Sequence, residues 1–272
     1  MIDALEQRWM RRRRSGPREL VAGIHVRQLG RGSPTIVLAA DPPNVVEHLA
    51  SLATRLAERY RVICIELPGF GFSDPDGDLA GMLVALDAAP YVLALSCAAG
   101  LLSASLAAAH PQLVSHVIGV QTPGLEGVRA WAARVDRRGL IRTRGVGQAL
   151  VALRRRRIAR GWYDVAVSDP DLRRSMLATT EASFDAGATY PLASALQTFA
   201  RMPAPPPIAQ PTLFVWGARD RAHRTTRRDE LAPGARVVEL ATAAHFPELE
   251  DIDGFTRAVH AFLDGAPGQL SR

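Results

Sequence analysis

The chain has 272 residues, 47% hydrophobic and 22% charged, which is enough for one sizeable core or for a core with a lid. All 33 basic residues are arginine and the formal net charge is +6, but no basic segment is interleaved with aromatic residues, so we expect no nucleic acid partner. The spacing of Cys64 and Cys97 suits neither a disulfide framework nor a metal site, and we expect no metal or other cofactor. The sequence contains neither an apolar run of about 18 residues nor a secretory signal, so we expect a cytoplasmic protein that does not enter membranes.

Two runs of four arginines stand out, at residues 11–14 and 154–157. Runs of this kind are usually solvated helix faces. The alternative is a site for an anionic partner, such as a carrier with a phosphopantetheine arm.

Short β-rich runs alternate with helical patterns along the chain. Apolar periodicity predicts helices over 45–60 and 253–263, and the alanine-rich stretch 98–109 predicts another. The expected strands are residues 24–29, 35–40, 61–67, 91–95, 114–120, 211–217 and 235–240. This alternation predicts an α/β fold with a mostly parallel, twisted sheet and helices on both faces.

The strand pattern is interrupted between residues 124 and 203. Four stretches there have helical patterns, at 128–135, 147–162, 169–185 and 191–202, and a proline-rich segment then leads back to the next strand. We expect residues 1–123 and 204–272 to form the core. Residues 124–203 are then a helical lid, or cap, over the carboxyl edge of the sheet, where α/β proteins bind ligands.

Four segments resemble successive blocks of the α/β-hydrolase superfamily, in that family's order. They are RVICIELPGFGFSD (61–74), HPQLVSHVIGVQTPG (110–124), PTLFVWGARD (211–220) and AHFPELEDIDGFTRAVHAFL (244–263). The resemblance covers nearly the whole chain apart from the helical insertion, and it implies the α/β-hydrolase fold.

The same resemblance implies an acid and a histidine. The family places its acid in the turn after a late strand and its histidine in a loop before the last helix, which here are Asp220 and His245. In such a pair the carboxylate fixes the imidazole tautomer and stabilises the protonated ring. The resemblance therefore implies that His245 is a general base and that Asp220 orients it.

The position of the nucleophile is ambiguous in YVLALSCAAG (91–100). The family's G-x-S-x-G elbow is a tight strand-to-helix turn flanked by small residues. The small side chain of Ala94 favours Ser96, because Ala94 lies two residues before it, where the elbow is tight.

The downstream spacing favours Cys97 instead. In the family, the helix after the elbow runs without a gap into a His-Pro pair, which here is His110-Pro111. The family's usual spacing before this pair implies a nucleophile at Cys97, with Gly100 in the place of a second elbow glycine. A thiol beside a histidine at a helix N-terminus is expected to ionise readily. We expect Cys97 to be the nucleophile, with the amide of Ala98 as an oxyanion donor, and Ser96 remains the alternative.

The loop after the strand 35–40 departs from the family. In place of His-Gly it has Ala40 and Asp41, and the position of the second oxyanion donor falls on Pro42, which has no N–H. One lost donor typically costs about 2.7–4 kcal/mol of transition-state stabilisation, and a carboxylate beside an oxyanion repels it. Three explanations are open: the loop register is shifted by one or two residues, the donor comes from elsewhere, for instance Asn44 or the lid, or the reaction forms no oxyanion.

We expect Trp131, Trp162 and Phe246 to contribute to the substrate site. Three functions are compatible with these residues. The first is hydrolysis or acyl transfer of an ester or thioester through a Cys97–His245–Asp220 triad, on a small apolar or acyl substrate that is free or carrier-bound, in bacterial secondary metabolism. The second is an elimination in which the His-Asp pair removes a proton from carbon. The third is ligand binding by an inactive relative.

Overall fold

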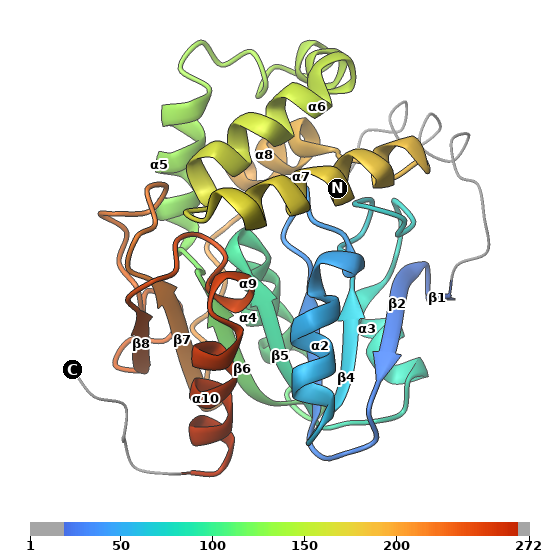
Figure 1. The fold of residues 1–272 in the computed structure, drawn as a ribbon, viewed down its shortest axis with the longest axis vertical. Helices are drawn as coiled ribbons and strands as arrows, with labels where there is room; N and C mark the ends of the chain where they lie inside the picture. The colour runs from blue at the N-terminus through green and yellow to red at the C-terminus, as the bar shows by residue number, and fades with distance from the viewer. Residues whose placement is uncertain (1–18, 266–272) are drawn as a thin grey trace.

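A computed structural model describes residues 19–265 (Figure 1). It contains an eight-stranded sheet in the order β1-β2-β4-β3-β5-β6-β7-β8. The strands are β1 (Leu20–Val21), β2 (Ile24–Leu29), β3 (Thr35–Ala39), β4 (Arg61–Ile65), β5 (Tyr91–Ser96), β6 (Val114–Val120), β7 (Thr212–Gly217) and β8 (Arg236–Leu240). The pairs β1–β2 and β2–β4 are antiparallel and all the others are parallel, which confirms the predicted sheet.

The central strands are buried from both sides. Every residue of β3, β5 and β7 is buried, because helices cover both faces of the sheet. One face packs against α2 (Ala50–Ala57), which continues the short turn η1 (Val46–Leu49), and against α10 (Ile252–Leu263). The other face packs against α3 (Leu79–Ala85) and α4 (Gly100–Ala109). Figure 1 shows the two layers in front of and behind the sheet.

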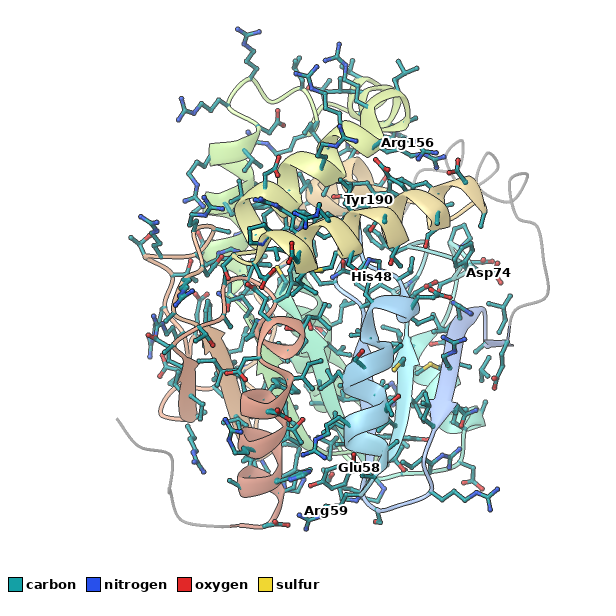
Figure 2. All side chains as sticks on the ribbon, viewed as in Figure 1. His48, Glu58, Arg59, Asp74, Arg156 and Tyr190 are labelled. Carbon is teal, nitrogen blue, oxygen red and sulfur yellow. The ribbon has the colours of Figure 1, made fainter. Side chains whose placement is uncertain are left out.

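Four helices lie between β6 and β7 in sequence and gather beyond one end of the sheet (Figure 1). They are α5 (Leu125–Val135), α6 (Val146–Ala166), α7 (Pro170–Asp185) and α8 (Leu192–Arg201). The phenol of Tyr163 in α6 donates a 2.6 Å hydrogen bond to Oδ1 of Asn44, which lies beyond the carboxyl end of β3. Nε2 of His48 donates to the carbonyl of Met176 in α7 at 3.0 Å, and Figure 2 shows His48 beneath that helix. The insertion therefore meets the carboxyl ends of the parallel strands.

The arginine run at 154–157 lies on α6 and partly serves packing. The guanidinium of Arg155 lies 4.7 Å from the ring centre of Phe184 in α7. Arg156, labelled in Figure 2, forms a 2.5 Å ion pair with Asp185 at the end of the same helix α7. The run at 11–14 falls outside the described residues. Within residues 19–265, no helix combines the length and apolar character that a membrane crossing requires.

Candidate active site

The turn after β5 has the geometry of a strand-to-helix elbow. Cys97 has φ +52°, in the left-handed region that a side-chain-bearing residue enters at a cost, and it begins the turn η2 (Cys97–Ala99) that leads into α4. At Gly100 a Cβ would overlap the side chain of Thr122, which follows β6. The close approach of α4 to this segment therefore requires glycine at position 100, and it keeps the bend at Cys97 tight.

Ser96 lies on the other side of the bend. Its hydroxyl donates a 2.9 Å hydrogen bond to Oε1 of Glu248, and the residue is 4% exposed. Glu248 belongs to the short helix α9 (Pro247–Glu250), just after His245. Sequence reasoning did not single out Glu248, although it lies in the segment 244–263, because that segment was used only to assign His245. The hydroxyl of Ser96 is thus directed to a carboxyl group and not to the imidazole.

Asp220 and His245 form a buried pair at the ends of two neighbouring segments. Nδ1 of His245 lies 3.2 Å from Oδ1 of Asp220. The Asp220 carboxylate also accepts from the amides of Ala222 and His223, at 3.0 and 2.8 Å, and from Nε2 of Gln121 at 2.9 Å. Burial alone would raise the pKa of Asp220, but the hydrogen bond from His245 and its charge outweigh burial and hold that pKa well below its usual range. Asp220 is therefore ionised and fixes the tautomer of His245.

Cys97 and Asp41 lie near the imidazole of His245 on the side opposite Asp220. One carboxylate oxygen of Asp41, Sγ of Cys97 and a ring nitrogen of His245 lie within 4.8 Å of one another. Nε2 of His245 is 3.7 Å from Oδ2 of Asp41. Among residues 19–265 this buried nitrogen makes no hydrogen bond. The ring therefore presents Nε2 to Cys97 and Asp41, with Nδ1 already committed to Asp220.

The protonation of this cluster differs from the prediction. Burial, followed by the charge of Asp41, raises the pKa of the Cys97 thiol, so the expectation that it ionises readily is wrong. Burial alone would lower the pKa of His245, but the neighbouring Cys97 and the hydrogen bond to Asp220 raise it well above its ordinary value. The proton that Cys97 would release is therefore held by His245, and the two groups titrate together. A thiolate forms when Cys97 passes its proton to His245.

The loop after β3 offers few backbone donors. The amide of Ala40 donates to the carbonyl of Ile65 at 3.0 Å, and the amide of Asn44 donates to the carbonyl of Asp41 at 2.9 Å. Pro42 and Pro43 have no N–H. Ala98, by contrast, is in the first turn of η2, where amides have no acceptor within the helix. Ala98 is therefore placed as a donor, whereas Pro42 and the Asn44 amide are not.

The expected aromatic residues lie in different environments. The ring of Trp162 in α6 is 4.7 Å from that of His245 and 5.4 Å from that of Trp131 in α5, measured between ring centres. Nε1 of Trp162 is buried and has no hydrogen-bond partner within residues 19–265. Phe246 is fully buried in the core cluster, and its ring centre lies 5.2 Å from that of His245.

The Asp41–Cys97–His245 trio is the one group in the described part of the chain whose ligand atoms are close enough for a metal ion. A metal would require both Cys97 and Asp41 to be deprotonated. Burial raises the pKa of both groups. A metal would thus have to displace two protons that burial favours, so we derive no metal site from the trio.

Comparison with known proteins identifies the family. A profile of the alpha/beta hydrolase family matches residues 9–258. The chain belongs to this family. It is 28% identical to a pimeloyl-[acyl-carrier protein] methyl ester esterase of Xanthomonas campestris pv. campestris, over 90% of this chain and 100% of that protein. It is 26% identical, with the same coverage, to the enzyme of that name in Xanthomonas oryzae pv. oryzae.

Solved structures agree on the fold. The enol-lactonase of Burkholderia xenovorans LB400 superposes with a TM-score of 0.68 at 24% identity, covering 91% of this chain and 100% of the lactonase. Epoxide hydrolase A of Mycobacterium thermoresistibile superposes with a TM-score of 0.70 at 20% identity, covering 94% and 99%. The α/β-hydrolase fold predicted from sequence is confirmed, and the protein is a hydrolase of this family.

Proposed function

We propose that the protein hydrolyses a carboxylic ester or thioester through an acyl group carried on Cys97. The observation that supports this proposal is the left-handed bend at Cys97, which places its sulfur in one cluster with His245 while Ser96 bonds to Glu248. The three side chains of the proposed triad come from the end of β5, the turn after β7 and the loop before α9.

In the proposed first half-reaction, Nε2 of His245 takes the proton of Cys97 as Sγ attacks the carbonyl carbon. A C–S bond forms, the carbonyl oxygen becomes an oxyanion, and the amide of Ala98 donates to it. Asp220 stabilises the imidazolium through Nδ1. The imidazolium then protonates the leaving alcohol or thiol as its bond to carbon breaks, which leaves the acyl group on Cys97.

The second half-reaction uses the same groups. His245, neutral again, removes a proton from water as the water oxygen attacks the thioester carbon. Collapse of the oxyanion breaks the C–S bond, and the imidazolium returns its proton to the sulfur. If an alcohol or amine takes the place of water, the same steps give acyl transfer.

We propose an acyl substrate attached to a carrier and a lid role for residues 124–203. The methyl ester esterases that match this chain act, by name, on an acyl-carrier protein, which supports the carrier. The contacts of α6 and α7 with the loop after β3 place the insertion beside the site, with Trp162 against His245. Bacterial secondary metabolism is the setting we propose, on the all-arginine composition.

Intact-mass spectrometry tests the covalent step. The protein is mixed with p-nitrophenyl butyrate or an acyl-pantetheine thioester and quenched in acid within the first turnovers. The wild type and Ser96→Ala should gain the mass of one acyl group, mapped by peptide analysis to Cys97, and Cys97→Ala should gain none. An adduct on Ser96, or persistent absence of an adduct despite turnover, would overturn the proposal.

The loop after β3 favours elimination as a second candidate. Its amides at Ala40 and Asn44 are committed and Pro42 has none, and proton abstraction from carbon by His245 depends less on oxyanion donors. Cys97→Ala separates the two candidates. Elimination predicts near-normal turnover in Cys97→Ala and loss in His245→Ala, whereas acyl chemistry predicts loss in both.

A further inference from the structure

Asp41 has an environment that the proposed triad does not explain. It follows β3 at the carboxyl edge of the sheet and is 7% exposed. Within residues 19–265 its carboxyl group accepts no hydrogen bond, and the nearest basic atom is Nε2 of His245, 3.7 Å away. An ionised carboxylate in such a place loses its hydration without gaining hydrogen-bond donors in return.

This environment favours the neutral carboxylic acid. Burial raises the pKa of Asp41, and the nearby imidazole of His245 opposes the rise without cancelling it. The other titratable groups that would sense a charge on Asp41 are Cys97, Glu248, Tyr163 and Tyr190, and an ionised Asp41 would raise the pKa of each. None of these four supplies a positive charge. A protonated carboxyl group has one O–H donor, which an ionised one lacks.

This O–H donor lies in the loop after β3, which has few free backbone N–H donors. Between residues 40 and 44, Pro42 and Pro43 have no N–H and the amides of Ala40 and Asn44 are committed, so the expected donor position at Pro42 lacks an N–H and only the amide of Asp41 has no acceptor among the described residues. The Asp41 carboxyl oxygen lies within 4.8 Å of Sγ of Cys97. A carbonyl carbon bonded to that sulfur carries its oxygen into hydrogen-bond reach of a group at this distance.

We propose that protonated Asp41 is the second oxyanion donor of this enzyme, its carboxyl O–H donating to the developing oxyanion opposite the Ala98 amide. The inference rests on the proposed acyl chemistry at Cys97. The proton of Asp41 stays on its oxygen throughout, so Asp41 strengthens one hydrogen bond in the transition state and takes no part in the proton transfers of His245.

Two variants of nearly equal size isolate the donor. Asp41→Asn keeps an N–H donor at the end of the side chain, and Asp41→Leu removes it. Single-turnover acylation of Cys97 by p-nitrophenyl butyrate should slow about 10²–10³-fold in Asp41→Leu, the usual cost of one oxyanion donor, and less than about tenfold in Asp41→Asn. Circular dichroism establishes that each variant is folded, and Asp41→Ala replaces Asp41→Leu if the latter is not.

Alkylation of Cys97 by iodoacetamide is the matched control, because that reaction forms no oxyanion. Asp41→Leu should alkylate at about the wild-type rate, since a protonated Asp41 carries no charge that acts on the thiol.

The outcomes separate this inference from the proposed function. Wild-type acylation of Cys97 in Asp41→Leu, or equal losses in Asp41→Asn and Asp41→Leu, would overturn the role of Asp41 and leave Cys97 as the nucleophile. Normal turnover by Cys97→Ala would overturn both.

Discussion

The hydroxyl of Ser96 and the carboxyl group of Glu248 form a buried hydrogen bond of 2.9 Å directly beside the elbow. Ser96 precedes Cys97, and Glu248 follows His245 by three residues, so this bond joins the two segments that carry the proposed nucleophile and base. The second carboxyl oxygen of Glu248 is buried and has no hydrogen-bond partner in the described part of the chain. We therefore expect changes in the Ser96–Glu248 pair to affect mainly the stability of the fold, and changes in the proposed triad to affect mainly the chemistry.

Ser96→Ala should weaken the fold more than the chemistry. Losing the hydroxyl leaves a buried carboxyl group without its donor, which costs about 1–3 kcal/mol. We expect the free energy of unfolding in urea to fall by that amount, while kcat for a p-nitrophenyl ester stays within about tenfold of the wild type. An inactive but equally stable Ser96→Ala protein would instead identify Ser96 as the catalytic hydroxyl.

Glu248 should make stability depend on pH. Burial raises the pKa of Glu248 to about 7 from an ordinary value of 4.5. Between these values the unfolded chain has lost the proton while the folded protein keeps it, so the folded state loses relative stability as pH rises from 4.5 to 7. Above pH 7 the full cost, about 3 kcal/mol, is present.

Glu248→Gln removes this titration and keeps an oxygen that accepts from Ser96. The variant should have a higher Tm than the wild type at pH 8, and the gain should disappear below pH 4.5. Thermal unfolding followed by circular dichroism at both pH values checks this prediction. A gain of the same size at both pH values would mean that folding does not shift the pKa of Glu248.

The sequence predicted the sheet well because the central strands are buried on both sides. Such strands read as continuous apolar runs, and β3, β5 and β7 end within one residue of the prediction. Three short elements were missed, namely β1, α3 and α9. They have two, seven and four residues, too few for a periodicity to emerge.

The site was less predictable than the fold. The sequence offered Ser96 and Cys97 as neighbours in a stretch of small residues, and local spacing alone cannot say which one faces the imidazole. In the structure a carboxyl group 152 positions away engages Ser96. The ionisation of Cys97 was predicted wrongly for a similar reason, since burial and Asp41, which comes from another loop, raise its pKa.

Replacing Cys97 by glycine should stabilise the protein relative to replacing it by alanine. Cys97 has φ +52°, which alanine tolerates poorly and glycine adopts freely. A residue with a side chain in the left-handed region costs about 1–3 kcal/mol of folding free energy, and glycine removes this cost. The larger conformational entropy of glycine in the unfolded chain offsets part of the gain. We expect Cys97→Gly to exceed Cys97→Ala by about 1 kcal/mol in the free energy of unfolding, with both variants unable to form an acyl adduct. Equal stability would show that the bend carries no strain.

Gly100→Ala should damage both the elbow and the fold. The added methyl group would overlap Cγ2 and Oγ1 of Thr122, so α4 must move away from the end of β6 and take the turn at Cys97 with it. We expect a loss of about 1–3 kcal/mol in the free energy of unfolding, as for other overpacked sites, and a slower acylation of Cys97.

Thr122→Ala removes the two atoms that Gly100→Ala would strike, so a double-mutant cycle tests the cause. The double variant should recover part of the stability and part of the acylation rate. Residues in contact usually show coupling energies of about 0.5–3 kcal/mol, so we expect a favourable coupling of at least about 0.5 kcal/mol between positions 100 and 122. Gly161→Ala in α6 is the control, because a Cβ at Gly161 meets no described atom within 4 Å, and helix propensity alone should then stabilise the protein by about 0.5–1 kcal/mol. Strictly additive effects at positions 100 and 122 would contradict the steric explanation and separate the elbow from the packing of α4.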